Sequence, residues 1–445
     1  MNGDSMFRRR FASAASGAEG RKAALARPER RWTLRSVAVL GVATLALASC
    51  GDDGDGGDEP GGDGDMFEGT FTLGLMLPQT GGLATFGEGM SAAAELAVQD
   101  VNEAGGVWGN DITQIIQDEG AAEEPEVVQA AADTMISQGA NAVVGAASST
   151  ATLNVIETLF NQKIIEISPS NTGVELTDHE FGDYYFRTAP SDVLQGSTLA
   201  EVALEDGHQT MAIMGQQTSY GESLAAQIEE VFTAGGGEVL TTEFYDLAQT
   251  EYAAEASAMA DSGADAFVLV SYEESRQVIP ALVGAGLDPQ DTQWYFVDGN
   301  NLGYDEDFDE GLMEGVKATT PGTAPEDLFT RVDEFRPGTP ERVYVPESYD
   351  AVITVALAAI AANADDQDAI RDAMFEVVTG GTKCTEFAEC KQLLESGEDI
   401  DYDGMTGPIS WMPETGGDPT EATIGIFEYG ADNTATRTDE RIGQL

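Results

Sequence analysis

The alternation of short apolar strands with longer amphipathic helical stretches is the feature that most constrains this chain. In its first half, segments rich in Val, Ile and Leu alternate with helical patterns that end near glycine. The predicted strands are 70–77, 111–118, 142–145 and 164–167, and the predicted helices are 89–103, 125–137 and 148–162. This β-α-β-α order predicts a parallel sheet with helices on both faces.

The same alternation restarts after Pro190. The strands expected there are 210–214, 238–245, 266–270 and 293–297, and the helices are 220–234, 252–262 and 275–285. A third helical block, 346–363 and 368–377, follows a stretch rich in Pro and Gly at 321–340. We therefore expect an α/β protein with two doubly wound parallel-sheet lobes and a ligand cleft between the lobes at the strand carboxyl ends.

The charge balance excludes one class of partner. The 445 residues contain 79 acidic and 21 basic residues, for a formal net charge of −58. Nine of the basic residues but only three of the acidic ones lie within residues 1–49. Because the remaining chain is strongly negative, it repels phosphate backbones. We therefore expect no binding of nucleic acid. Crowded carboxylates also suggest a surface built for high salt, which screens their repulsion.

The N-terminal segment is typical of a bacterial lipoprotein. Arginines precede an apolar run at 37–48, which is too short to span a membrane but suits a signal peptide. Leu-Ala-Ser-Cys at 47–50 forms a lipobox, and Gly and Asp dominate the segment that follows it. We predict a signal peptide at 1–49, lipid on Cys50, and a flexible acidic tether at 50–67. The body would then lie outside the cytoplasm, anchored to the cell membrane by lipid. An ordinary leader that happens to contain a cysteine is the alternative.

Two other cysteines, Cys384 and Cys390, are separated by five residues. Outside the cytosol such a pair indicates a small-loop disulfide. A redox pair is the alternative, but the C-x-x-C spacing is missing.

Several stretches, in this order and spacing, resemble one family. They are 74–81, 86–87, 97–107, 143–145, 168–172, 220–221 and 407–409. Together they are similar to the type I periplasmic binding proteins of the leucine/isoleucine/valine-binding kind, which serve ABC importers. The resemblance covers residues 68–445. It implies two lobes joined by three crossovers, which close on a ligand like a hinge. It places 68–188 and 322–410 in the first lobe and 189–321 and 411–445 in the second.

An amino acid ligand offers a carboxylate, and hydroxyls at a helix N-terminus can hold it. Ser149 lies where strand 142–145 turns into a helix, and Thr172 follows strand 164–167. Both match the carboxylate-binding positions that the resemblance implies, and Ser170 lies next to them. The alternative is that Ser149 is only an N-cap and Thr172 only a loop hydroxyl.

The ligand ammonium needs an anion, and Asp298 follows strand 293–297 where the family has an acidic residue. Asp is shorter than the Glu of the branched-chain-binding members, which changes its reach. The expected aromatic walls are Phe86, Tyr220, Tyr272 and Tyr344. Core packing of these rings is the alternative.

Glu273 and Glu347 lie close to Tyr272 and Tyr344. They could make the pocket more acidic and favour a cationic or amide ligand. We interpret them instead as surface charge.

Enzyme and metal functions have little support in the sequence. There are only two histidines, and the chain has no G-x-S-x-G elbow and no phosphate-binding loop. Residues 399–404 match the opening of an EF-hand loop, but Ser410 stands where a bidentate Glu is required. We therefore expect no catalysis, no cofactor and no metal.

The sequence thus predicts the lipid-anchored substrate-binding protein of an ABC importer, with an amino acid of the branched-chain type or a related polar solute as ligand and an ABC permease as partner. A ligand-sensing receptor for amides, urea or polyamine-like solutes is the alternative. A lipid-anchored hydrolase lacks a nucleophile and base.

The acidic composition predicts that potassium chloride stabilises the protein, because screening weakens the repulsion between carboxylates. The midpoint of thermal unfolding should rise as the chloride concentration rises. Chloride is preferable to sulfate, which strengthens apolar burial in most proteins. A midpoint that is highest in dilute buffer would contradict the interpretation.

Overall fold

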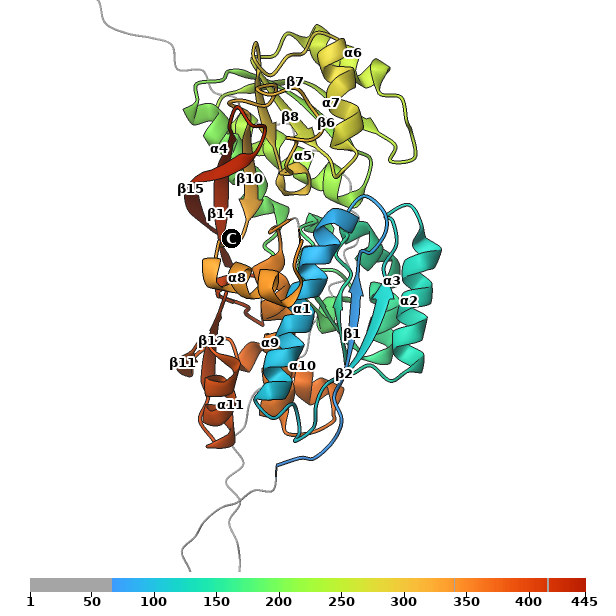
Figure 1. Cartoon of the computed structure of the whole chain (residues 1–445), viewed down its shortest axis with the longest axis vertical. Coiled ribbons are helices and arrows are strands. Elements are labelled where there is room, and N and C mark those ends of the chain that lie inside the picture. The colour runs from blue at the N-terminus through green and yellow to red at the C-terminus, as the bar shows by residue number, and fades with distance from the viewer. Residues whose placement is uncertain (1–65, 340, 414–415) are drawn as a thin grey trace, which may run out of the picture. The chain divides into compact units, whose positions relative to one another are not determined.

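The computed structural model of the chain describes residues 66–339, 341–413 and 416–445 (Figure 1). The predicted signal peptide, Cys50 and all but the last two residues of the predicted tether lie outside the described residues.

The first half of the described chain forms a five-stranded sheet, all parallel, in the order β2-β1-β3-β4-β5. Its strands are β1 (Thr72–Leu77), β2 (Thr113–Asp118), β3 (Ala142–Gly145), β4 (Ile165–Ser168) and β5 (Tyr185–Arg187). The helices between them are α1 (Ala84–Glu103), α2 (Pro125–Ser137) and α3 (Ser149–Gln162). Because the winding direction reverses between β1 and β3, the loops after these strands diverge and leave a crevice at their carboxyl ends.

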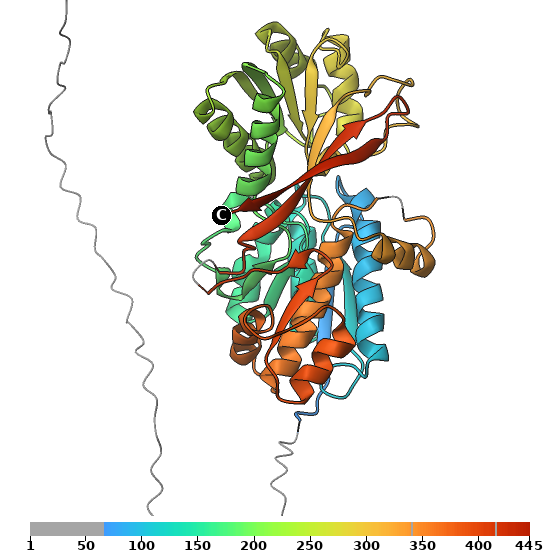
Figure 2. The same cartoon turned by 90° about the vertical axis from the view of Figure 1, so that its left-hand side faces the viewer.

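A seven-stranded sheet follows, in the order β15-β14-β10-β9-β8-β6-β7. Its parallel part contains β6 (Thr210–Gln216), β7 (Glu238–Tyr245), β8 (Ala266–Val270), β9 (Gln293–Phe296) and β10 (Lys317–Pro321). The antiparallel hairpin β14 (Glu421–Tyr429) and β15 (Ala435–Gln444) extends it beyond β10, as Figure 2 shows. Here the winding reverses between β6 and β8, so this sheet has its own crevice.

Helices cover both faces of this second sheet. Those on one face are α4 (Asp192–Glu205) and α5 (Ser219–Ala234), and those on the other are α6 (Ala253–Ser262) and α7 (Ser275–Gly284). Alternate residues of the strands supply the two apolar layers, as in any sheet buried on both faces. The second sheet is therefore buried on both faces.

The chain then returns to the five-stranded sheet. The returning helices are α8 (Glu326–Phe335), α9 (Val345–Ala362), α10 (Gln367–Glu376) and α11 (Phe387–Glu395). α9 packs beside α1 on one face of the sheet, and α2 and α3 cover the other (Figure 1). By length and composition α9 could cross a membrane, but 89% of it is buried in the protein, as befits a core helix.

A small sheet carries the disulfide. It consists of β11 (Thr382–Cys384), β12 (Ile400–Gly404) and β13 (Gly407–Pro408). Cys384 and Cys390 are bonded, as predicted, with their Cα atoms 5.4 Å apart. The bond joins β11 to α11.

Three differences from the predicted elements have local causes. Helix α1 begins at Ala84 rather than residue 89, and no side chain caps its start. Helix α8 lies inside the stretch interpreted as Pro- and Gly-rich, because the helix fits between Pro325 and Gly338 and buries Leu328 and Val332, four residues apart, on one face. The β14-β15 hairpin was not expected, since its strands are partly exposed and rich in charge.

A buried ion pair joins distant parts of the chain. Arg187, at the end of β5, donates from Nε and Nη2 to the two carboxylate oxygens of Asp418 at 2.7 and 2.6 Å. Its Nη1 donates to the carbonyl oxygens of Asn171 and Gly173, and Nη2 also donates to Thr177. The pair thus fixes both the loop after β4 and the segment that leads into β14.

Replacing Asp418 by Asn should lower the free energy of unfolding by about 3–5 kcal/mol, because the charge of Arg187 stays buried without a counterion. Urea unfolding measures the loss. Asp333→Asn, which breaks the exposed pair with Arg342, is the matched control and should cost far less. Equal losses in the two variants would show that the buried pair has no special role.

Candidate functional site: an enclosed cavity between the two sheets

Carboxyl ends of strands from both sheets meet at one small cavity of about 20 Å³. Seven of the eight predicted ligand residues line it, and they are Phe86, Ser149, Ser170, Tyr220, Tyr272, Asp298 and Tyr344. The other lining residues are Leu83, Met90, Ala147 and Gly299. Thr172, the eighth predicted residue, is buried nearby but does not line the cavity.

The start of α3 presents Ser149. Ser148, not Ser149, is the N-cap, and its Oγ accepts a hydrogen bond from the backbone N–H of Ala151. The alternative in which Ser149 acts as the N-cap is therefore wrong by one residue. Ser149 Oγ instead accepts from the N–H of Gly173 at 3.2 Å. This contact leaves the hydroxyl hydrogen of Ser149 free to turn toward the cavity.

The loop after β4 supplies the other hydroxyls. Ser170 Oγ donates to the carbonyl oxygen of Ala147 at 3.0 Å. Thr172 Oγ1 is buried and has no hydrogen-bond partner among the described residues. The carboxyl group of Asp192 lies close to this hydroxyl, since Thr172 helps to lower the pKa of Asp192.

Asp298 is the anion of the site and comes from the other sheet. It follows β9 and is 3% exposed. Its Oδ1 accepts from Tyr220 at 2.7 Å and from Gln195 at 2.8 Å, and its Oδ2 accepts from Tyr344 at 2.6 Å. All three donors are neutral. Burial raises the pKa of Asp298, and these hydrogen bonds oppose the rise.

The aromatic walls come from both sides of the cavity. Tyr220, near the start of α5, stacks on Tyr272, which follows β8, with ring centroids 5.2 Å apart. Phe86 lies in the first turn of α1 rather than in a loop, and Tyr344 is the residue before α9. Since Tyr344 lies on the α8-α9 side, its bond to Asp298 crosses between the two sheets. A second crossing bond runs from the N–H of Glu273 to the carbonyl oxygen of Gly82 at 3.3 Å.

At about 20 Å³ the cavity has room for about one water molecule. Two larger cavities flank it. One of about 340 Å³ shares Leu83 and Tyr272 with it, and one of about 510 Å³ shares Tyr344. A solute as large as an amino acid can therefore enter only if these walls separate.

Buried carboxyl groups surround the site, and sequence reasoning missed most of them. Glu119 accepts from the N–H groups of Ala147 and Ser148, directly before α3. Burial raises the pKa of Glu119 and of Glu166 to about 8, and that of Asp192 to about 7. The only available signal was position, because Glu119 follows β2 directly at its carboxyl end.

Glu347 was interpreted as surface charge, and this is wrong. It is buried on α9, since this helix is covered on nearly all sides. Glu273 is only partly exposed.

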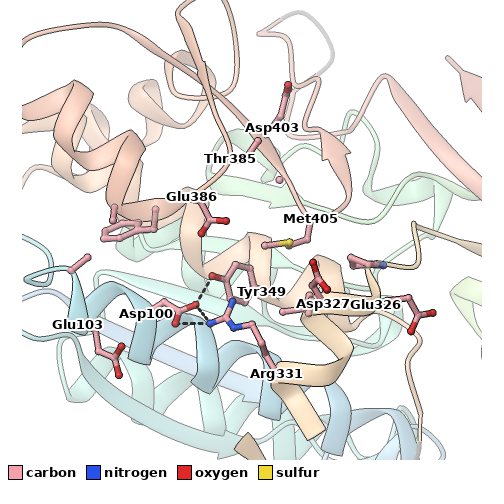
Figure 3. A pocket seen from close by; sticks show the side chains of 16 residues that line it. Asp100, Glu103, Glu326, Asp327, Arg331, Tyr349, Thr385, Glu386, Asp403 and Met405 are labelled. Atoms are coloured by element: carbon pink, nitrogen blue, oxygen red, sulfur yellow. Dashed lines mark hydrogen bonds and ion pairs between the residues drawn. The ribbon is translucent and has the colours of Figure 1, made fainter. Parts of the chain in front are cut away.

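A larger cavity of about 890 Å³ lies elsewhere, beside α1, α8 and α11. In Figure 3, Asp100 lies between Arg331 and Tyr349, and both donate to it. The other labelled charged residues are all acidic: Glu103, Glu326, Asp327, Glu386 and Asp403. Because its one arginine is already neutralised, this cavity offers a ligand no free cation and no unpartnered buried group.

The carboxylates of the EF-hand-like segment 399–404 form ion pairs with a lysine. Lys383 Nζ lies 3.1 Å from Asp401 and 2.8 Å from Asp403. Within the part of the chain that the structure describes, no group of three or more His, Cys, Asp or Glu side chains could hold a metal ion.

The family model described as "Periplasmic binding protein" matches residues 70–425. The chain belongs to the periplasmic binding protein family. This match confirms the predicted resemblance and the expectation of a binding protein rather than an enzyme.

Among curated relatives, the leucine-, isoleucine-, valine-, threonine- and alanine-binding protein of Pseudomonas aeruginosa is 25% identical over 338 residues, which cover 73% of this chain and 88% of the relative. The leucine-specific-binding protein of Salmonella typhimurium is 25% identical over 367 residues, covering 80% and 90%. The family as described is one of periplasmic, and so extracytoplasmic, binding proteins.

Solved structures confirm the predicted two-sheet α/β fold. A leucine-binding protein from Thermotoga maritima matches with a TM-score of 0.68 at 18% identity, covering 83% of this chain and 98% of that one. A branched-chain amino acid transporter substrate-binding protein from Streptococcus pneumoniae, solved with isoleucine, has a TM-score of 0.67 at 19% identity, covering 85% and 100%. A solute-binding protein from Rhodopseudomonas palustris, solved with 3,4-dihydroxybenzoic acid, has a TM-score of 0.68 at 21% identity, covering 84% and 98%.

The buried carboxyl groups predict a pH dependence of stability. Glu119 and Glu166 keep a proton in the folded state up to about pH 8 but lose it near pH 4.5 when unfolded. The folded state then binds more protons, so the free energy of unfolding should fall as pH rises from about 5 to 8. Asp118, whose pKa is lowered, titrates below this window.

Urea unfolding at several pH values measures this slope. Glu166→Gln should flatten it by up to about 1.4 kcal/mol per pH unit. A stability that is constant or rises over this window would contradict the assignment.

Proposed function

We propose that the chain is the extracytoplasmic substrate-binding protein of an ABC importer and encloses a small zwitterionic solute, an amino acid of the branched-chain type or a related compound, in the cavity between the sheets. One observation carries this proposal. Asp298 from one sheet and the hydroxyls of Ser149 and Ser170 from the other face the same enclosed cavity. The ammonium of a zwitterion can pair with Asp298, and its carboxylate can accept hydrogen bonds from Ser149 and Ser170.

The charge of Asp298 explains the ammonium end. Its three donors are neutral, and no ion pair to it is formed within the described residues. A ligand ammonium would supply the missing positive charge and would be held more strongly away from water.

The start of α3 explains the carboxylate end. Ser149 and Ser170 offer hydroxyls, and the positive end of a 14-residue helix favours a negative group there. Thr172 lies in the same loop as Ser170 and stays a predicted third hydroxyl for this end, although it does not line the cavity. The rings of Phe86 and Tyr272 are then left for the apolar part of the solute.

Ligand binding requires the walls of the cavity to part. We assign 68–188 and 322–410 to one lobe and 189–321 and 411–445 to the other, with the crossovers as a hinge. A solute that contacts both lobes stabilises the closed arrangement, and this closed form would dock on the permease. The Tyr344–Asp298 bond supports this proposal, because it spans the two sides of the cavity.

The lipid anchor on Cys50 and the signal peptide at 1–49 belong to the same proposal. They rest on the lipobox and on the extracytoplasmic character of the family. Metabolic labelling with a radioactive fatty acid tests the anchor, and Cys50→Ser should abolish the labelling.

A second group of solutes deserves the same test, because relatives in solved structures hold aromatic acids such as 3,4-dihydroxybenzoic acid. An aromatic acid brings no cation to Asp298. The buried carboxyl group of Asp298, which lines the cavity, instead favours solutes with a positive group, such as the polyamine-like compounds of the alternative receptor function.

Asp298→Asn should weaken binding by about 2–5 kcal/mol, because the ammonium then loses its buried counter-charge. A thermal-shift panel of amino acids, amides, polyamines and aromatic acids at high salt identifies the solute, and calorimetry then measures its affinity. Asp305→Asn, an exposed residue in the loop after β9, is the control and should bind normally. Unchanged affinity of Asp298→Asn for every solute bound by the wild type would refute the site.

A further inference from the structure

A separate cavity of about 510 Å³ lies where the chain crosses between the sheets, behind Tyr344. We call it the hinge chamber. One wall is the segment from Glu341 to Glu347, before and in the first turn of α9, together with Phe329 of α8. The opposite wall comes from the end of β10, from β14 and from β15, and includes Gly322 and Arg437. Both sheets therefore contribute to the hinge chamber.

Glu347 is the unusual residue of this chamber. It is 1% exposed, and its side chain lines the cavity. Among the described residues, no other residue donates a hydrogen bond to its carboxylate, although its main-chain oxygen accepts from Thr188. A buried carboxyl group in this state costs free energy unless something in the cavity pairs with it.

The backbone at Gly322 makes room for this carboxyl group. Gly322 has a φ of +101°, and a Cβ built on it would lie 2.2 Å from Glu347 Oε1. A side chain at this position would fill the space in which the carboxylate stands. The carboxylate of Glu347 therefore fits in the hinge chamber because residue 322 is a glycine.

The two arginines of the chamber are engaged with other carboxylates. Arg342 donates from Nη2 to both oxygens of Asp333 at 2.6 Å, while its Nη1 is buried without a partner among the described residues, and Arg437 pairs with Glu440 at 3.0 Å. Arg437 does lower the pKa of Glu347, but burial outweighs it and raises that pKa to about 8, with Asp350 adding to the rise. With this pKa Glu347 keeps its proton below about pH 8, so a cation that entered the chamber would pair with the carboxylate as that proton leaves.

We propose that the hinge chamber is a second binding site, distinct from the cavity at Asp298, and that it takes a small organic cation with an ammonium or guanidinium head, which pairs with Glu347. The aromatic ring of Phe329 and the ring of Tyr344 supply apolar surface for the rest of the cation. Since both sheets line the chamber, an occupant would favour the arrangement of the sheets that encloses it. The site would thus adjust how readily the main cavity closes.

Calorimetry on the full chain, at constant potassium chloride, tests the site with putrescine, agmatine and methylguanidine as probes. At least one probe should bind saturably to the wild type. Glu347→Gln, which keeps the shape and removes the charge, should weaken this binding about tenfold or more. Glu326→Gln removes an exposed carboxylate at the rim of the same chamber and should leave the binding unchanged.

Asp298→Asn separates this inference from the proposed function. It should leave binding of the cation intact while it weakens binding at the main cavity. Loss of cation binding in Asp298→Asn would assign the cation to the main cavity and overturn the second site. Saturable binding of no probe to the wild type would overturn it as well, as would equal binding to the wild type and Glu347→Gln.

Hydrogen exchange on the wild type gives a readout that needs no variant. A bound cation should slow exchange in peptides that cover 320–323, 344–347 and 435–437. Protection confined to other segments would place the cation elsewhere and contradict the proposal.

Discussion

The buried pair of Arg187 and Asp418 is the interaction on which the site depends. The Arg187 guanidinium donates hydrogen bonds to acceptors from separate segments of the chain. The acceptors are Asp418, Thr177 and the carbonyl oxygens of Asn171 and Gly173. Burying a guanidinium is costly, so the surrounding chain has to keep these acceptors in place. The result is a fixed loop after β4, and this loop holds the hydroxyls that face α3.

The parts of the fold that depend on local pattern could be predicted from the sequence. Apolar strands and helix-ending glycines showed the β-α order, and the order placed Asp298 and Tyr272 at strand ends. The choice between two adjacent serines could not be made, because Ser148 and Ser149 are equally good N-caps and only the packing of Gly173 against Ser149 decides. The lobe boundaries remain a prediction.

The buried carboxyl groups could not be predicted, and the reason is physical. In a chain with 79 acidic residues an isolated Glu or Asp resembles surface charge, and its burial depends on contacts far away in sequence. Glu347 became buried because α9 is covered by α1 and other helices, whereas Glu119 accepts two N–H groups from a loop 28 residues further on. The same acidic composition that charges the outer surface thus also supplies the few carboxyl groups in the interior.

The proposed function requires one solute that contacts both sheets. The crystal structure of the protein with the solute identified by the thermal-shift panel tests this claim most directly. The account predicts solute density in an enlarged cavity, with its ammonium within hydrogen-bond distance of Asp298 and its carboxylate at Ser149 and Ser170. Density confined to the 890 Å³ cavity beside Arg331, with the small cavity unchanged, would contradict it.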